Sequence, residues 1–270
     1  LPNCPEFIVA YWATLRLGAV VAPVNTRLRA DELQYVLKNC DPKVVVVHEQ
    51  TAAATCEALA AEGLAPHVLA AGEARGSAGK AGSSAGFQLA ALDLEALGGL
   101  GARTTSADIA TDDLAVILHT SGTTGVPKGA MMRHSDLLFN VGNAILAHSL
   151  RHEDRHLLVI PCFAPTASYS LLASCAYLGA AIVIAPRPQP AEILDLIERH
   201  RCTTFIGVPT LFHLVLQEAR LASADLSSLR LIAYSGSPMP TRTIRLLRER
   251  FPGVALHNFF GLTETISITH

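Results

Sequence analysis

The alternation of apolar and polar residues predicts helices and strands near the N-terminus. Apolar positions recur at helical spacing through residues 5–17 and stop at Gly18, a residue typical of helix C-caps. A short apolar strand is expected at 19–24 and a helix at 31–38. The β-branched run at 43–47 is typical of a buried strand. We therefore expect an α/β arrangement from the start of the chain.

From residue 114 onward, short apolar runs and segments with helical spacing alternate regularly. Strands are predicted at 114–118, 157–160, 181–185, 205–208 and 229–234, helices at 171–177, 192–200, 211–220 and 241–251, and a further helix around Leu137, Leu138, Val141 and Ile145. The connections are short, which favours a layered α/β unit with a mostly parallel sheet. Ligands of such sheets gather at the carboxyl ends of the strands. The informative loops are therefore expected after Leu118, Ile160, Val208, Tyr234 and Leu256.

A change in composition separates these two regions. Residues 71–86 consist largely of Ala, Gly and Ser and are too poor in large apolar side chains to fold alone. Residues 82–86 match the G-x-S-x-G pattern of hydrolases, but the strand and helix that this motif needs are not predicted around it. We therefore expect a first α/β lobe at 1–110, with a loop or linker near 71–110, and a second α/β lobe at 111–270.

Size and charge limit the classes of function. The chain has 270 residues, of which 50% are apolar, enough for one large domain or two ordinary ones. A net charge of −2 and a pI near 6.6 give no electrostatic footprint for nucleic acid. The longest apolar stretch, 171–185, is too short to span a bilayer comfortably. A solvated helix face explains the basic run of Arg242, Arg245, Arg248 and Arg250.

Cysteine usage and the N-terminal residues indicate a cellular compartment. The six cysteines are scattered without a C-x-x-C pair, which favours reduced thiols over a disulfide framework or a zinc site. The first residues lack the charged and apolar regions of a signal peptide. A cytoplasmic location is expected.

A stretch of small polar residues follows the strand predicted at 114–118. Its sequence at 119–129 is His-Thr-Ser-Gly-Thr-Thr-Gly-Val-Pro-Lys-Gly. Backbone N–H groups in a concave bend, together with hydroxyls and a lysine, are what a polyphosphate needs. Pro127 excludes a Walker loop, and no G-x-G-x-x-G opens a helix here. We expect a strand-to-helix phosphate loop, the alternative being a plain surface turn.

Residues 119–129 resemble, nearly letter for letter, the phosphate-loop signature of the adenylate-forming (AMP-binding) superfamily. That superfamily comprises acyl- and aryl-CoA ligases, peptide-synthetase adenylation domains and luciferases. Residues 1–47 are similar to its early segment, where a helix ends in Leu-Gly-Ala before a Pro-Val-Asn strand exit. The resemblance implies the large domain of such an enzyme, an αβαβα-type layered fold with mostly parallel sheets. It also implies contacts to the phosphates of ATP from Thr120, Ser121, Gly122, Thr123, Thr124, Gly125 and Lys128.

A second candidate loop, Ser-Gly-Ser-Pro-Met at 235–239, follows the strand that ends at Tyr234. Small residues there would let a flat ring lie against the backbone. A plain turn before a helix explains the residues equally well. In the adenylate-forming superfamily the matching Gly-x-Pro segment borders the adenine pocket, so the resemblance implies that role for Gly236, Ser237 and Pro238.

A third stretch, His-Asn-Phe-Phe-Gly-Leu-Thr-Glu-Thr at 257–265, combines aromatic rings, a glycine and an acid. It fits a base-stacking ring with a magnesium ligand, or alternatively a hydrophobic strand end with a solvated glutamate. The stretch resembles the Tyr-Gly-x-Thr-Glu signature of the same superfamily, with Phe260 in place of tyrosine. The resemblance implies that Phe260 stacks on adenine, that Thr263 contacts the α-phosphate side, and that Glu264 binds Mg²⁺ together with Thr120. The nucleotide contacts are completed by Asn258, Phe259, Gly261 and Leu262.

Two features depart from the family pattern. Members commonly have Pro-x-Phe-His where this chain has Pro-Cys-Phe-Ala at 161–164, so Ala164 leaves the acyl-site chemistry open. The chain also ends at His270, before the ribose-binding Asp, the hinge and the small domain that carries the catalytic lysine in complete members. Residues 1–270 therefore resemble only part of such an enzyme.

The resemblance implies ATP-dependent activation of a small-molecule carboxylic acid to an acyl-adenylate, followed by transfer to CoA. The expected catalytic residues are Lys128, Thr263 and Glu264, the expected cofactors are ATP and Mg²⁺ with CoA as co-substrate, and a homodimer is left open. The preferred subclass is a fatty or aromatic acid–CoA ligase. Alternatives are a non-catalytic nucleotide- or acyl-binding fragment, a decayed ligase, or a peptide-synthetase adenylation domain. The last would need an acidic anchor for the substrate amine where Thr166, Ala167 and Ser168 stand.

Overall fold

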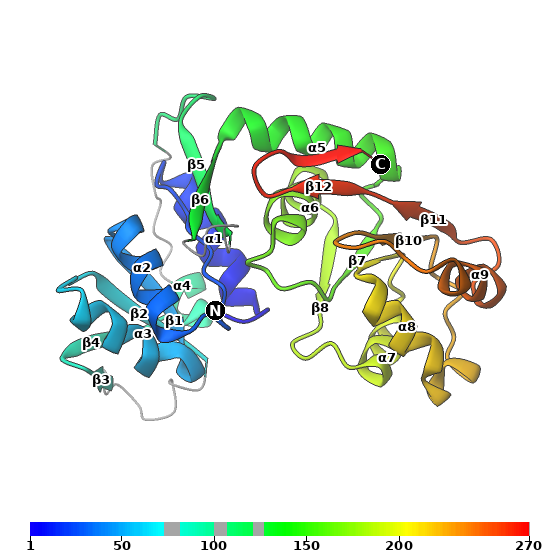
Figure 1. Ribbon diagram of the computed structural model, residues 1–270, viewed down its shortest axis with the longest axis horizontal. Helices are drawn as coiled ribbons and strands as arrows, with labels where there is room; N and C mark the ends of the chain where they lie inside the picture. The colour runs from blue at the N-terminus through cyan, green and yellow to red at the C-terminus, as the bar shows by residue number, and fades with distance from the viewer. Residues whose placement is uncertain (73–81, 100–106, 121–126, 270) are drawn as a thin grey trace. The chain divides into compact units, whose positions relative to one another are not determined.

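The computed structural model describes residues 1–72, 82–99, 107–120 and 127–269 (Figure 1). These residues form two compact units, Leu1–Met132 and Arg133–His270, and each is described by itself. The division falls after Met132 rather than at the expected 110, because the strand that begins at Leu114 is bonded to the N-terminal segment. Val21 donates its N–H to the carbonyl of Ala115 at 2.9 Å, and Ile117 donates to the carbonyl of Val21 at 3.0 Å.

The first unit contains a four-stranded sheet in the order β1-β2-β4-β3. Strands β1 (Val44–His48), β2 (His67–Ala71) and β4 (Phe87–Ala91) run parallel, while β3 (Gly82–Ser84) is antiparallel to β4. Helices α2 (Ala30–Cys40) and α3 (Glu49–Ala61) pack on each other, and α3 also contacts β1, β2 and β3. The buried core between helices and sheet includes Leu37, Val47, Cys56, Leu59 and Val68.

The start of the chain confirms one predicted helix and shortens one predicted strand. Helix α1 (Pro5–Arg16) ends where expected, and Gly18 adopts φ 69°, the left-handed conformation that glycine tolerates at a helix end. The strand expected at 19–24 is wrong, because only Val21 forms a bridge, to Val116. Pro23 follows two residues later and has no N–H to continue a ladder.

Regular structure also occupies part of the segment expected as a linker near 71–110. Strands β3 and β4 and helix α4 (Leu94–Gly99) lie within it. The expectation is wrong for these residues because Phe87 and Leu89 pack against the core of the first unit. The Gly-Ser-Ser-Ala-Gly stretch at 82–86 forms β3 and the turn into β4, so it is no strand-to-helix elbow. Residues 73–81 and 100–106 lie outside the described part.

The second unit is built on a parallel five-stranded sheet in the order β11-β10-β9-β7-β8. Its strands are β7 (Arg155–Leu158), β8 (Ala181–Ile184), β9 (Thr204–Gly207), β10 (Leu231–Tyr234) and β11 (Ala255–Asn258). The helices are α5 (His134–His148), α6 (Leu172–Leu178), α7 (Pro190–His200), α8 (Pro209–Gln217) and α9 (Thr241–Arg250). A short 3₁₀ segment, η3 (Ala219–Ala222), follows α8. Each predicted strand and helix of this region is present, with ends shifted by a few residues.

The order of connections places the helices on both faces of this sheet. The chain passes from β7 to β8 through α6 and then returns through α7 to β9, on the other side of β7. Because parallel crossovers are right-handed, this reversal puts α6 on one face and α7, α8 and α9 on the other. Figure 1 shows α5 on the same side as α6. The resulting three-layer arrangement confirms the predicted α/β class for this unit.

Two further elements were not expected from the sequence. Residues Thr166–Leu171 form a π-helix, η2, that leads directly into α6, so this helical region begins before the predicted residue 171. After β11 the chain forms a two-stranded sheet of β12 (Phe260–Leu262) and β13 (Ile266–Thr269), and β13 contacts α5 and η2 (Figure 1). Within the described ranges, no helix combines the length and the apolar character needed to cross a membrane.

Candidate active site

The carboxyl ends of the second unit's strands form one aligned edge. Tyr234, the last residue of β10, is in register with Gly207 of β9 and with Asn258 of β11, while Leu158 of β7 is in register with Ile206. The direction of the chain across the sheet reverses between the neighbouring strands β7 and β9. Such a reversal is where ligands bind in open α/β sheets. The structure therefore brings the loops predicted after these strands to one edge.

The loop after β10 is exposed at this edge. Gly236, Ser237 and Pro238 face solvent, whereas Ser235 is buried and donates its N–H to the carbonyl of Gly207 at 3.3 Å. Gly236 has φ 88°, a conformation that L side chains rarely adopt. A Cβ there would lie 3.6 Å from Val208, so the backbone conformation, not space, requires glycine. This loop presents bare backbone, as a flat ring would need.

The two phenylalanines that follow β11 have different environments. The N–H of Phe259 donates to the carbonyl of Tyr234 at 3.1 Å, and its ring is buried edge-on against His148 with centroids 5.4 Å apart. Phe260 is 54% exposed and Leu262, two positions further on β12, is 49% exposed. Alternate residues of a strand share a face, so Phe260 and Leu262 form an exposed apolar surface. The ring available for stacking is that of Phe260, and Phe259 supports the segment from inside.

Glu264 lies in the tight turn between β12 and β13. Thr265 donates its N–H to the carbonyl of Leu262 at 3.2 Å, which closes the turn, and Ile266 follows with φ 59°. A β-branched residue in this region is strained by about 1–3 kcal/mol, and such strain clusters at functional sites. The carboxylate of Glu264 is exposed at the turn, while Thr263 is half-buried. An exposed carboxylate is the type of oxygen ligand that Mg²⁺ takes alongside substrate phosphates.

The predicted phosphate loop belongs to the first unit. Thr120 is the last residue of β5 (Leu114–Thr120), Pro127 is buried, and the exposed Lys128 is the first residue of β6 (Lys128–Arg133). The expected strand-to-helix loop is wrong in one respect, because β6 pairs with β5 before α5 begins. No helix N-terminus therefore follows the loop directly. The predicted contacts Ser121, Gly122, Thr123, Thr124 and Gly125 lie outside the described residues.

Close packing supports the far end of this loop. A Cβ on Gly129 would lie 2.9 Å from Cγ2 of Ile117 and 3.3 Å from Nε2 of His119, so β6 approaches β5 as only glycine permits. His119 Nε2 is 3.0 Å from Oδ1 of Asn39 on α2, and burial lowers the pKa of His119. The predicted loop thus connects β5 and β6, two strands that pack closely at Gly129 and are held to α2 through His119. Its convergence with Glu264 of the second unit stays a prediction.

Ala164, which stands where family members commonly have histidine, lies in the loop after β7. Ala164 donates its N–H to the carbonyl of Pro161 at 2.9 Å, and its own carbonyl accepts from the N–H groups of Ala167 and Ser168. The hydroxyl of Ser168 donates to the carbonyl of Cys162 at 2.5 Å. The loop therefore opens the π-helix η2, a rare element that is frequent at functional sites. A small hollow beside it is lined by Thr166, Ser170, His148, Ile206 and Phe259 among others.

A buried polar network holds the opposite, amino-terminal end of the same sheet. Asp154 is 3% exposed and forms an ion pair with Arg230, whose Nε lies 2.8 Å from Oδ1. Thr203 donates to Oδ1 at 2.7 Å and the backbone N–H of Arg151 to Oδ2 at 2.8 Å. Burial alone would raise the pKa of Asp154, but these hydrogen bonds outweigh it and lower the pKa. The network ties the starts of β7, β9 and β10 together.

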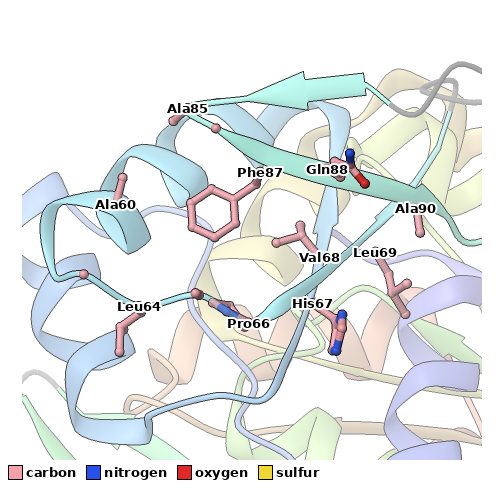
Figure 2. A pocket seen from close by; sticks show the side chains of 13 residues that line it. Ala60, Leu64, Pro66, His67, Val68, Leu69, Ala85, Phe87, Gln88 and Ala90 are labelled. Carbon is pink, nitrogen blue, oxygen red and sulfur yellow. The ribbon is translucent and has the colours of Figure 1, made fainter.

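A larger hollow in the first unit has a different character. About 760 Å³ in volume, it is lined by the turn after α3, β2, β4 and the turn that precedes β4, and Figure 2 shows Phe87 and Val68 among its lining residues, on the neighbouring strands β4 and β2. Its lining is mostly apolar, and among the described residues that line it His67 is the one ionisable side chain. None of the predicted site residues that the structure describes lines it. In the second unit, the predicted site residues that the structure describes lie at the carboxyl edge of the sheet and in the β12–β13 hairpin, and in the first unit they are Thr120 and Lys128, on either side of the predicted phosphate loop.

The described residues show which side chains could bind a metal ion and which thiols are free. Among them, no group of three or more His, Cys, Asp and Glu side chains could hold a metal ion. The six cysteines are free, as predicted, and four of them are buried.

Sequence reasoning missed the paired histidines beneath this edge. His148 and His257 lie 109 positions apart and meet through their Nδ1 atoms at 3.0 Å. His257 is the first residue of the predicted nucleotide-binding stretch, but no local sequence pattern predicts that its partner lies at the end of α5. A pairing of this kind leaves no periodic signal in the sequence.

Comparison with known proteins identifies the family. A model described as "AMP-binding enzyme" matches residues 1–270. Indoleacetate–CoA ligase of Aromatoleum aromaticum is 34% identical over 266 residues, which cover 98% of this chain and 49% of that protein. The crystal structure of the anthranilate CoA ligase AuaEII in complex with anthranoyl-AMP matches with a TM-score of 0.85 at 25% identity, over 97% of this chain and 49% of that one. ATP-bound MatB from Rhodopseudomonas palustris matches with a TM-score of 0.79 at 28% identity, over 97% of this chain and 48% of that one.

These matches confirm the predicted fold and superfamily. The chain spans about half the length of the curated relatives that it matches. The family model covers the whole chain, and the strand edge described above carries the motifs that pointed to it. The chain thus belongs to the AMP-binding, adenylate-forming enzyme family, whose acid–CoA ligases are among its relatives.

Proposed function

We propose that the protein to which this chain belongs uses ATP to convert a carboxylic acid into an acyl-adenylate and then transfers the acyl group to the thiol of CoA. In the first step the carboxylate oxygen attacks the α-phosphorus and pyrophosphate leaves. In the second step the CoA sulfur attacks the acyl carbon and AMP leaves. The observation that carries the proposal is the family match along residues 1–270. The exposed Phe260 and Glu264 at the ligand-binding edge of a parallel sheet support it.

We assign the roles of the residues from the family resemblance, and their exposure is compatible with it. Phe260 offers an exposed ring for adenine, and the exposed Gly236, Ser237 and Pro238 are assigned to the border of the adenine site. Thr263 is assigned to the α-phosphate. Lys128 and the loop 120–125 are assigned to the phosphate charges that build up on the leaving group, a form of electrostatic stabilisation.

Mg²⁺ is the metal that the oxygen-donor residues fit. Glu264, in an exposed turn, and Thr120, at the end of β5, would hold the ion when ATP binds. The ion would offset part of the negative charge that opposes the approach of an anionic carboxylate. CoA enters as co-substrate in the second step.

The substrate class we propose is an aromatic or fatty acid. Two relatives are named for aromatic acids, indoleacetate and anthranilate, and another for long-chain fatty acids. The residues at 166–168, Thr-Ala-Ser, include no acid to anchor a substrate amine, which disfavours an amino-acid-activating domain. A cytoplasmic location accompanies this proposal.

Calorimetry with Mg²⁺ and ATP on the 270-residue chain tests the nucleotide site. We expect binding that depends on Mg²⁺, and Glu264→Ala should remove that dependence. Glu249→Ala, an exposed glutamate on α9, serves as the matched control and should bind as the parent does. Absence of both heat and thermal stabilisation in the parent chain would refute the nucleotide site.

Ala164 motivates a second candidate, a nucleotide- or acyl-binding protein that does not turn over. Members of the family commonly have histidine at this position, and here the side chain is a methyl group. ATP–pyrophosphate exchange in the presence of aromatic and fatty acids separates the two. Exchange supports the ligase, while binding without exchange in the complete protein supports the second candidate.

A further inference from the structure

Two histidines form a close pair beneath the segment that carries the proposed nucleotide contacts. His148 is the last residue of α5, and His257 lies on β11 just before Asn258. Their Nδ1 atoms are 3.0 Å apart, and their rings are stacked with centroids 5.2 Å apart and planes at 27°. His148 is 3% exposed. Phe259 packs edge-on against the ring of His148, at 72°.

The hydrogen bond restricts the protonation of the pair. One Nδ1 must carry a proton and donate it, and the other must keep its lone pair and accept it. Two neutral rings of opposite tautomer satisfy this condition, and so does one neutral ring with one cationic ring. Two cationic rings do not, because both Nδ1 atoms would then carry protons at 3.0 Å and both rings would carry positive charge. The pair therefore accepts at most one proton beyond neutrality.

The surroundings oppose the second proton. Burial lowers the pKa of His257, and the charge of Arg230 lowers it further. Arg230 is itself paired with Asp154, so its charge is partly offset. The elements packed against the pair and the turn after β12 carry three other acidic or basic side chains. His134 and Asp136 lie at the opposite end of α5 from His148, and Glu264 lies in the exposed turn. Elements η2 and β12 carry no Asp, Glu, Lys, Arg or His.

The location of the pair links it to the site. Phe259 donates its backbone N–H to Tyr234 and places its ring against His148, while the next residue, Phe260, begins β12. Moving the ring of His148 would remove its contact with Phe259, and His257 holds that ring through the contact between the two Nδ1 atoms. Phe260 and Glu264 follow Phe259 within five residues, so their positions depend on how the ring of Phe259 is held.

We propose that His148 and His257 are positioning residues that hold the segment 259–264 in its nucleotide-binding conformation, and that a second proton on the pair releases it. This inference rests on the proposed function of that segment. It predicts that Mg²⁺–ATP affinity falls at a pH well below the ordinary histidine pKa of about 6.5, because the first proton leaves the hydrogen bond intact and burial and Arg230 oppose the second.

The test compares the parent chain with His257→Asn and His148→Asn. The asparagine amide offers a donor and an acceptor near the position of Nδ1 and does not titrate. Calorimetry with Mg²⁺ and ATP is run from pH 7.5 to pH 4.5, and the parent-to-variant ratio of affinities at each pH cancels the titration of ATP itself. We expect this ratio to fall by about tenfold over the range, the factor that corresponds to one pKa unit of coupling. His213→Asn, an exposed histidine on α8, is the matched control and should follow the parent.

Hydrogen exchange measured by mass spectrometry separates this inference from the proposed function. Lowering the pH should accelerate exchange of residues 259–265 in the parent, relative to peptides of α7, and not in His257→Asn. A parent chain that binds no ATP at pH 7.5 would refute the proposed nucleotide site, and this exchange measurement would still decide whether the pair holds the segment. A constant affinity ratio with equal exchange in parent and variant would overturn the inference. A pH-dependent melting temperature without either change would show that the pair only stabilises the fold, and would also overturn it.

Discussion

The buried imidazole of His156 should make the second unit sensitive to acid. His156 lies on β7, is 1% exposed and forms a short contact through Nδ1 with the hydroxyl of Thr204 on β9. Its Nε2 is buried without a hydrogen-bond partner among the described residues. Burial lowers the pKa of His156 from 6.5 to about 4, with the charge of Asp154 opposing and that of Arg230 adding to the decrease. The native state therefore keeps this ring neutral.

The sign and size of the effect follow from linkage. Because the folded pKa lies below the unfolded one, the unfolded state binds more protons, and stability is complete above pH 6.5 and lost as the pH falls toward 4. Between pH 7.5 and 5.0 the loss from this one group is about 2 kcal/mol, and it approaches about 3.4 kcal/mol below pH 4. A change of 2 kcal/mol is a large part of the stability of an ordinary domain.

The perturbation is His156→Gln, which keeps a polar partner for Thr204 and removes the titration. Urea unfolding from pH 7.5 to 5.0 would be followed by circular dichroism, with hydrogen exchange of peptides from β7 and β9. Trp12 is the single tryptophan and belongs to the first unit, so its fluorescence is an internal reference. We expect the variant to lose about 2 kcal/mol less than the parent over this range. Equal pH slopes for β7 and β9 in the two proteins would show that His156 is not the responsible group.

Substitutions at Asp154, Gly236 and Phe260, two of them with a control substitution, test the support and the surface of the site. Asp154→Ala should cost about 3 kcal/mol in urea unfolding because it leaves the charge of Arg230 without its partner, whereas Asp225→Ala, in an exposed ion pair, should cost much less. Gly236→Ala should destabilise by about 1 kcal/mol through its positive φ, and should weaken ATP binding in calorimetry. Phe260→Leu should weaken ATP binding by about 1–3 kcal/mol, a typical value for base stacking, while Phe260→Tyr should retain it. Unchanged affinity in Phe260→Leu would argue against the stacking role.

The sequence alone determined the elements whose burial leaves a local pattern. Helices α7 and α9 were found because their apolar residues recur at the spacing of one buried face, and strands β9 and β10 because they are short apolar runs, buried at every position. The stretches after Thr120, Tyr234 and Asn258 were also recognisable, because their small, aromatic and acidic residues stand in a short, fixed order. These local features were sufficient to identify the family.

Only the tertiary structure decided the features that depend on distant partners. Strand β6 exists because it pairs with β5, and β4 because it pairs with β2, although neither shows a clear period of its own. The burial of Phe259, in contrast to the exposed Phe260, and the contact between His148 and His257 depend on α5 lying beside β11. A periodic pattern records which face of a segment is buried, not what covers it. The partner of each side chain is therefore decided by packing.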